Sequence, residues 1–217
     1  MTFRVAFPSK AEQRTIGTFL DHESEHIDAL IAGKWARFNV SQEKRNALVN
    51  HAVTKGLNPN APMKDTGIEW LGEIPEHWAV QKLKYIASAR FSNVDKHTGE
   101  GERLVRLCNY VDVYYNDYIT ADLDFMKATA KPTEIAEFEL KKGNVIVTKD
   151  SETWDDIAVP AYVSTDLNDV LCGYHLAQIR PNTELVDGKY LFRPFSARGI
   201  NDQFRIETVK YSGMGEQ

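Results

Sequence analysis

Apolar side chains recur along the first part of the chain at steps of three, four and seven residues. They are Ile16, Phe19, Leu20, Ile27, Leu30, Ile31, Trp35 and Phe38, and the series resumes at Leu48, Val49, Ala52 and Val53. Steps of this size place side chains on one face of an α-helix, which makes a turn every 3.6 residues. Charged residues such as Asp21 and Glu25 fall on the other face. The pattern predicts a long amphipathic helix.

The ends of this helix are marked by residues with known capping behaviour. Ser9 can cap the first turn, and Glu12, three residues later, completes a capping box. Gly56 suits the left-handed conformation that ends many helices. Between them, Gly33 and residues 39–41 (Asn-Val-Ser) are weak helix formers. The sequence therefore predicts either one long helix that is weak at this point, or two helices of which Ser41 caps the second.

A single amphipathic helix cannot bury its apolar face against itself. That face can pack on the chain's own globular domain, or it can form a helix–helix interface with a second copy or another subunit. We favour the interface, because the chain offers no second helix of similar length. The residues expected there are Ile16, Leu20, Ile27, Leu30, Ile31, Trp35 and Phe38.

The hydrophobic pattern changes its period after the helix. Residues 57–67 (LNPNAPMKDTG) have the composition of a linker. Short β-rich runs then follow between Gly, Asn and Asp clusters, at 84–91, 104–115, 144–148, 158–163 and 170–179. Two short helices are expected at 132–138 and 189–197, and Pro194 should end or kink the second.

Strands with few helices, and without βα alternation, predict an α+β fold. The expected organisation is a helical region at 1–56, a linker at 57–67 and a globular domain at 68–217. The domain should hold a mixed, mainly antiparallel sheet with short helices. The helical region should act as a spacer of the coiled-coil type.

The net charge of −5 argues against a free-standing DNA-binding protein, which is usually basic. The charge is uneven: residues 1–62 hold 8 Lys and Arg against 6 Asp and Glu, whereas residues 63–217 hold 18 against 25. No run of 18 apolar residues predicts a membrane span, and the first residues lack the apolar core of a signal peptide. We therefore expect a cytoplasmic protein.

Motifs for catalysis are weak or absent. The sequence has no Gly-x-Gly-x-x-Gly loop, no P-loop and no Gly-x-Ser-x-Gly elbow. Residues 58–62 (NPNAP) only partly match the base-holding loop of adenine methyltransferases. Glu139 and Lys141, with Asp122 or Asp124, could imitate a magnesium-dependent nuclease site, but Glu-x-Lys is common by chance. We expect no catalytic activity and no bound cofactor.

The two cysteines, Cys108 and Cys172, are expected to be reduced and buried in strands. Together with His175 they could supply three zinc ligands. The residues around them have the pattern of a buried strand, so core cysteines are the favoured interpretation and no metal site is expected.

Several loops combine aromatic side chains with hydrogen-bonding groups. They include 108–118 (CNYVDVYYNDY), 148–154 (TKDSETW) and 173–175 (GYH). Such side chains can read base edges or stack on bases. Loops of this composition are nevertheless more often part of an ordinary protein surface. The residues expected to contact DNA are Lys149, Ser151, Trp154, Tyr174, His175, Tyr115 and Asn116, with Arg205 and Lys210 on phosphates.

Short segments spread over nearly the whole chain are informative when they are taken together. The helical region contributes AEQRTIGTFLD (11–21), IDALI (27–31), EKRNAL (43–48) and AVTKGL (52–57). The following domain contributes KDTGIEWLGEIPEHW (64–78), LKKGNV (140–145), TKDS (148–151), CGYHL (172–176) and GKYLF (188–192). In this order the segments are quite specific, and they resemble the specificity subunits of type I restriction–modification systems.

The resemblance implies a non-catalytic subunit that recognises double-stranded DNA. In the family, two target-recognition domains alternate with two helical regions, and each domain reads one half of a bipartite target. The two helices pair antiparallel and bind the methyltransferase and endonuclease subunits. ATP, Mg²⁺ and S-adenosylmethionine are expected only on those partner subunits.

This chain holds one helical region and one recognition domain, which is half the usual content. That content fits a half subunit, a truncated product or a fragment. Residues 33–41 lack the Leu-rich sequence of the family. Residues 208–214 resemble an altered version of the family's usual Thr-Arg-aromatic-Gly-Leu motif. Two copies could pair through the helix as a homodimer. The alternative function is a protein-interaction or assembly module with a degenerate recognition domain.

Overall fold

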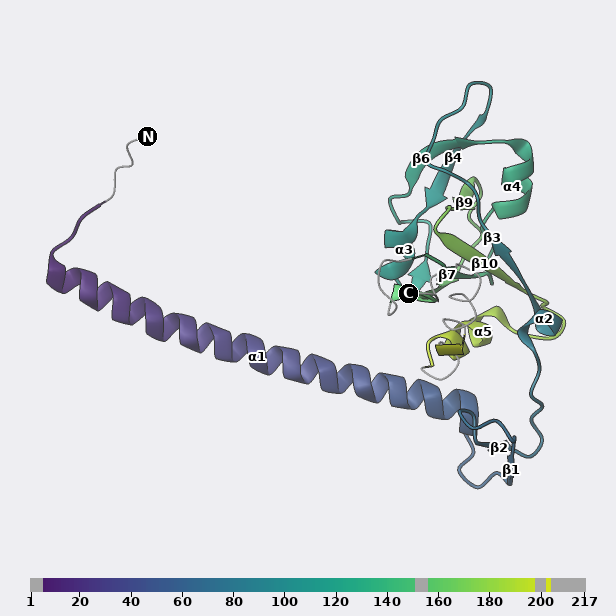
Figure 1. Cartoon of the computed structure of the whole chain (residues 1–217), viewed down its shortest axis with the longest axis horizontal. Helices are drawn as coiled ribbons and strands as arrows, with labels where there is room; N and C mark the ends of the chain where they lie inside the picture. Colours follow the sequence, from purple (N-terminus) through teal and green to yellow (C-terminus); the bar gives the residue numbers. More distant parts are fainter. Residues whose placement is uncertain (1–5, 151–155, 198–201, 204–217) are drawn as a thin grey trace, which may run out of the picture. The chain divides into compact units, whose positions relative to one another are not determined.

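The computed structural model describes residues 6–150, 156–197 and 202–203. The chain divides into two compact units, Met1–Ala47 and Leu48–Gln217. The first unit consists of most of helix α1 (Lys10–Lys55), and the second holds the last turns of α1 and all the strands (Figure 1). This is the predicted α+β fold, with a long N-terminal helix followed by mixed, mainly antiparallel sheets. Among the described residues, no helix is both long and apolar enough to cross a membrane.

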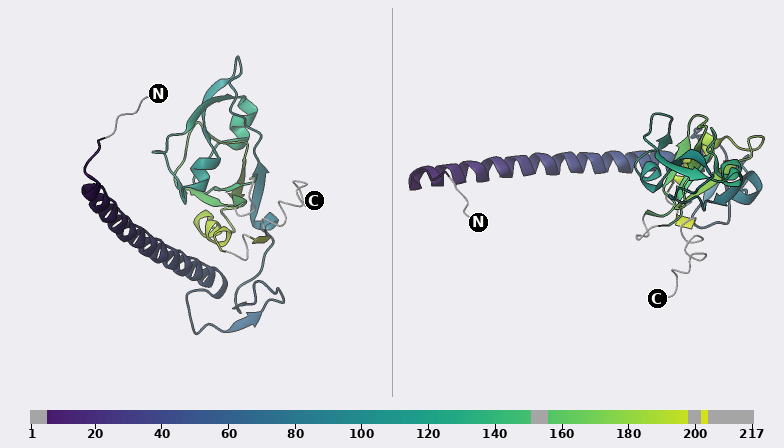
Figure 2. Two further views of the ribbon diagram at one scale, coloured as in Figure 1. Left: turned by 60° about the vertical axis from the view of Figure 1, so that its left-hand side comes forward. Right: turned by 90° about the horizontal axis from the view of Figure 1, so that it is seen from above.

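Helix α1 is a single helix of 46 residues, so the first of the two predicted alternatives holds (Figure 2). The predicted capping box forms: the Ser9 amide donates to Glu12 Oε2 at 2.9 Å, and the Glu12 amide donates to Ser9 Oγ at 3.4 Å. Ser41 does not cap a second helix, because its hydroxyl donates to the Arg37 carbonyl at 2.9 Å within the continuous helix. Gly56 ends the helix at φ +77°.

The apolar face of α1 is largely exposed. The seven residues predicted to form an interface are each 47–62% exposed. Trp35 and Phe38 make an edge-to-face contact with ring centroids 5.9 Å apart. In the whole 46-residue helix, only Val53 and Thr54 in the last turn are buried.

The segment that follows α1 is folded and includes part of the expected linker. Strands β1 (Met63–Asp65) and β2 (Glu73–Pro75) form an antiparallel hairpin. The Thr66 amide and hydroxyl both donate to the Gly72 carbonyl, which closes the turn. Lys55 Nζ donates to the Glu73 carbonyl at 2.8 Å, so the end of α1 is tied to the hairpin. The last part of the segment expected to be a linker, 57–67, thus contains strand β1.

The larger sheet has five strands in the order β3-β10-β7-β8-β5. All neighbours are antiparallel except the parallel pair β5–β8. The strands are β3 (Ala87–Phe91), β10 (Leu176–Pro181), β7 (Val145–Thr148), β8 (Pro160–Val163) and β5 (Tyr118–Ile119). Helices α2 (Leu83–Ile86) and α5 (Gly188–Phe195) supply Leu83, Ile86, Leu191, Phe192 and Phe195 to a core against this sheet.

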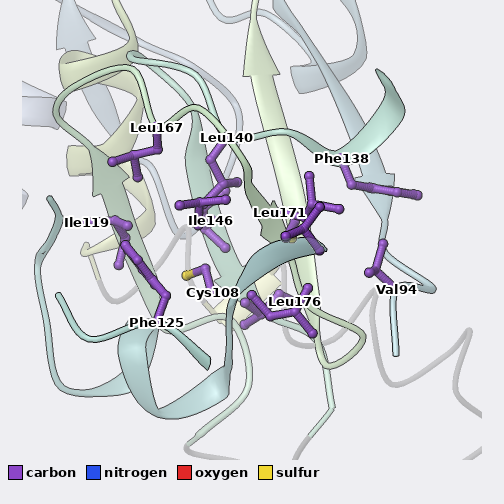
Figure 3. Packing of buried hydrophobic residues seen from close by; sticks show 14 of the residues in the cluster. Val94, Cys108, Ile119, Phe125, Phe138, Leu140, Ile146, Leu167, Leu171 and Leu176 are labelled. Carbon is purple, nitrogen blue, oxygen red and sulfur yellow. The ribbon is translucent and has the colours of Figure 1, made fainter. Parts of the chain in front are cut away.

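The smaller sheet has three strands in the order β6-β4-β9, with β4 and β9 parallel. Its strands are β6 (Met126–Ala130), β4 (Arg103–Cys108) and β9 (Val170–Cys172), and helices α3 (Tyr110–Tyr114) and α4 (Pro132–Phe138) adjoin it in sequence. The main core includes buried residues of both sheets. Figure 3 shows Cys108, Ile119, Phe125, Ile146, Leu171 and Leu176 within it.

Several predicted elements need correction. The strand expected at 84–91 begins with the single turn α2. The strand expected at 104–115 ends at Cys108 and continues as α3, because the Asn109 amide donates to the Asp112 carboxylate at 2.7 Å in a capping box. The strand expected at 170–179 is two strands in different sheets, β9 and β10, separated at Gly173. Helix 132–138 is confirmed, and α5 contains Pro194 in its last turn.

Candidate nucleic-acid interface

Four strand ends converge at one edge of the domain. Strands β4 and β9 are parallel and end at the register partners Cys108 and Cys172, and β7 ends at Thr148 opposite Leu176, where β10 begins. Backbone hydrogen bonds join the segments beyond these ends: the Gly173 amide donates to the Cys108 carbonyl at 2.9 Å, and the Lys149 amide to the His175 carbonyl at 3.0 Å. The predicted loops 108–118, 148–154 and 173–175 therefore start from one place.

Gly173 is required for this convergence. A Cβ atom at this position would lie 2.7 Å from the Cys108 carbonyl oxygen and 3.1 Å from Asn109 Oδ1. The first distance is shorter than real Cβ contacts, and the atom it meets is backbone. The absence of a side chain thus lets Tyr174 and His175 follow directly beside the start of α3.

Ser92, Lys149, Asp150, Tyr174 and His175 form what we call the strand-end cluster. The Lys149 ammonium donates to the Ser92 carbonyl at 2.9 Å and lies 4.5 Å from the centroid of the Tyr174 ring. Its side chain is 14% exposed. Ser92 is itself fixed, because its hydroxyl donates to the Cys172 carbonyl at 2.5 Å.

These contacts bear on the role expected for Lys149. We expected Lys149 to contact DNA, and in this structure its ammonium is engaged by groups of its own chain. A lysine that is mostly buried and holds a neighbouring ring is better suited to positioning that ring than to reading a base edge.

Tyr174 and His175 lie on the surface between the end of β9 and the start of β10. Tyr174 is 49% exposed. The His175 ring meets it nearly at right angles, with centroids 5.1 Å apart. His175 Nδ1 lies 3.5 Å from Asp150 Oδ2, which is also 4.0 Å from Lys149 Nζ. The two aromatic side chains therefore form one exposed group supported by a lysine and a carboxylate.

A second aromatic group lies on α3, and sequence reasoning found only part of it. Tyr110 and Tyr114 stack with centroids 5.5 Å apart and planes 16° from parallel. Tyr115 meets Tyr114 edge-on at 5.1 Å and is 77% exposed. The four-residue spacing of Tyr110 and Tyr114 was a visible signal, but it has meaning only if the segment is a helix. We had predicted a strand here.

This second group is connected to the end of β7. The Tyr114 hydroxyl donates to Asp156 Oδ1 at 2.9 Å, and the Thr148 hydroxyl donates to the Asp156 carbonyl at 2.5 Å. The hydrogen bond to the Asp156 carboxylate raises the pKa of Tyr114. The predicted residue Asn116 is also engaged, because its side-chain amide donates to the Asp112 carbonyl at 2.9 Å.

The carboxylates around this surface have partners within the chain. Asp150 is near His175 and Lys149, Asp156 accepts from Tyr114, and Asp112 accepts from the Asn109 amide. Burial raises the pKa of Asp112. The Lys149 ammonium beside Asp150 moderates the repulsion that this carboxylate would exert on a phosphate. The predicted residues Ser151, Trp154, Arg205 and Lys210 lie outside the described residues.

The residues weighed as metal ligands serve other purposes. Cys108 and Cys172 are free thiols buried at their strand ends, as expected, and burial raises the pKa of Cys172 to about 12. Glu139 follows α4, and its carboxylate lies 3.5 Å from the Asp169 amide that donates to it. Within the described ranges, no three His, Cys, Asp or Glu side chains are grouped so as to hold a metal ion.

No protein-family model and no curated protein matches the sequence. Three solved structures are similar at low identity. A chain described under complex assembly and conformational transition of the type I R-M system has 14% identity and a TM-score of 0.45, over 87% of this chain and 41% of the other. The HsdS subunit from Thermoanaerobacter tengcongensis has 10% identity and a TM-score of 0.43, over 97% and 55%.

The third similar structure is the S subunit of a type I restriction–modification system from M. genitalium. It has 13% identity and a TM-score of 0.40, over 92% of this chain and 45% of that one. The chain thus spans only 41–55% of the length of these solved chains.

Proposed function

We propose that the chain is a sequence-specific DNA-recognition module of the kind found in type I restriction–modification specificity subunits, and that it has no catalysis of its own. The convergence of the strand-end cluster and the α3 tyrosines at one edge of the domain carries the proposal. Exposed aromatic and hydrogen-bonding groups there come from loops that a rigid sheet positions. Such an arrangement suits recognition better than chemistry.

The charge distribution fits a module that reads bases while other subunits hold the phosphates. Residues 63–217 carry a net −7, from 18 basic and 25 acidic residues, which is unsuited to binding DNA by bulk attraction. Methyltransferase and endonuclease subunits would supply the phosphate contacts and the cofactors ATP, Mg²⁺ and S-adenosylmethionine. Low nonspecific affinity in the module itself would then favour discrimination between sequences.

Helix α1 supplies the second surface of the proposed function. Its apolar face would bind partner subunits or pair with a second copy of the chain, which would place two recognition domains in one assembly. An exposed apolar face of this length in the described part of α1 also favours the alternative function, a protein-interaction module without DNA recognition.

Selection from a randomised duplex pool separates the two functions. The chain would be incubated with its methyltransferase subunits, and bound duplexes would be recovered and sequenced. A recognition module should enrich one half-site motif, and the enrichment should disappear when Tyr174 and His175 are both replaced by alanine. An assembly that forms but enriches no motif would reject DNA recognition in favour of the protein-interaction module.

A further inference from the structure

Tyr174 is held more firmly than an ordinary exposed tyrosine. The Lys149 ammonium lies over its ring, and the His175 ring contacts it edge-on. Lys149 in turn is anchored on the Ser92 carbonyl, and Gly173 is anchored on the Cys108 carbonyl. Segments from β3, β4, β7 and β9 thus contribute to the position of one ring.

Holding a half-exposed ring in one position costs conformational entropy, and binding of a ligand to the ring can offset this cost. Aromatic contacts are strongest when the side chain loses little freedom on binding, which is what prior anchoring provides. The Lys149 side chain is mostly buried in this arrangement, and its ammonium is hydrogen-bonded within it. A lysine left in solvent would have been the simpler surface residue.

We propose that Tyr174 stacks on a nucleobase that has left the base stack, and that Lys149 and Gly173 are positioning residues for this contact. The inference rests on the proposed DNA-recognition function and names the form of DNA that the site takes. An aromatic side chain reaches the face of a base only where a duplex is kinked or a base is extruded. The α3 tyrosines offer further aromatic surface for the same distorted site.

A base is a better occupant than a protein side chain because of the surroundings. The Lys149 ammonium lies 4.0 Å from the Asp150 carboxylate, so Asp150 attracts an incoming cation such as arginine less strongly. Every nucleobase has a π-face, and stacking of this kind tolerates different bases. Tyr174 would therefore sense distortion of the duplex, and the residues around it, among them His175 and Tyr115, would sense base identity.

The probe is a duplex with a single bulged 2-aminopurine, whose fluorescence is quenched by stacking. The same duplex with an abasic bulge, and the fully paired duplex, are the reference ligands. The full-length chain, with its methyltransferase subunits, should bind the aminopurine bulge about tenfold more tightly than the abasic bulge and should quench its fluorescence. Equal affinity for the two bulges would overturn the proposal.

Substitutions assign the effect to the ring. Tyr174→Phe should keep the preference and the quenching, whereas Tyr174→Ala should lose both. Lys149→Met should weaken the quenching and should reduce the preference for the aminopurine bulge less than Tyr174→Ala does, because it removes the support and not the ring. If a normally folded Tyr174→Ala variant still prefers the aminopurine bulge over the abasic bulge, the proposal is wrong.

The chain contains a matched control for these variants. Tyr85 on α2 is 62% exposed and also has a lysine over its ring, with Lys84 Nζ 5.1 Å from the centroid. It lies on another element, so Tyr85→Ala should change nothing. If the chain selects a paired target but does not prefer the aminopurine bulge, the proposed function stands and this inference is wrong. If the chain binds none of the duplexes, alone or assembled, both are wrong.

Discussion

Helix α1 leaves most of its large apolar residues exposed, whereas the sheet domain has strands that are fully buried. In α1 only Val53 and Thr54 are buried, although eight large apolar residues lie between Ile16 and Phe38. In the sheet domain, strands β7 and β9 are buried along their whole length. A side chain that is already buried contributes to folding, whereas one left exposed can contribute only when a partner covers it. The same substitution should therefore damage folding in one region and association in the other.

A matched pair of phenylalanines gives the largest expected contrast. Phe192 in α5 is fully buried, whereas Phe38 in α1 is half-exposed. Phe192→Ala should lower the free energy of unfolding by about 3–5 kcal/mol, because it leaves a cavity in the core. Phe38→Ala should lower it by less than about 1 kcal/mol in the monomer. Urea denaturation at low protein concentration measures both, and similar losses would mean that α1 is stabilised within the chain.

Charged substitutions on the exposed face test association without testing the fold. Ile27→Asp and Leu30→Asp should abolish self-association or binding to methyltransferase subunits, because a carboxylate would be buried in an apolar interface. Ala32→Asp is the control, since helix geometry places it on the other side of α1. Sedimentation velocity with and without methyltransferase subunits measures the effect. A wild-type chain that stays monomeric and ignores those subunits would contradict the interface.

A tyrosine pair makes the same comparison within the sheet domain. Tyr115 lies on the candidate interface and Tyr190 lies on α5, and both are substantially exposed. In the assembled complex, Tyr115→Ala should cost about 1–3 kcal/mol on the selected half-site and far less on random DNA. Tyr190→Ala should cost little on either. Fluorescence anisotropy gives the affinities, and losses of the same size for both tyrosines would remove Tyr115 from the site.

The smallest effect is expected at the buried thiols. Burial raises the pKa of Cys172 to about 12 and raises that of Cys108 as well, so little thiolate exists at pH 8. Both thiols should react with a disulfide reagent far more slowly in the native protein than after denaturation. Rapid labelling of the native protein would show that the edge where β4 and β9 end opens readily.

The elements that sequence predicted well are those with strong local signals. The Ser9–Glu12 capping box, the stop at Gly56 and the Pro132 start of α4 act within a few residues, and all are present. Strands β5 and β6 gave too short an apolar pattern to be recognised. The division of 170–179 depends on the close approach of Gly173 to Cys108, which is a contact between distant segments.

The structure brings the loops of the candidate site together at one edge of the domain, and their role in binding DNA stays a prediction. Tyr115, Tyr174 and His175 could be chosen because they follow or interrupt strands, and strand ends tend to meet. The role of Lys149 could not be read from sequence, because its partner Ser92 lies 57 residues away. The stack of Tyr110 on Tyr114 was missed because aromatic residues in 104–115 favoured a strand, whereas the Asn109–Asp112 capping box starts a helix.

The central claim is that the strand-end cluster and the neighbouring Tyr115 read DNA sequence. It is tested most directly by the ratio of affinities for the selected half-site and for random duplex, measured in the assembled complex at one salt concentration. The account predicts that replacing Tyr115 and His175 together by alanine reduces this ratio at least about tenfold, while affinity for random duplex stays nearly constant. Equal losses on both duplexes, or an unchanged ratio, would contradict it.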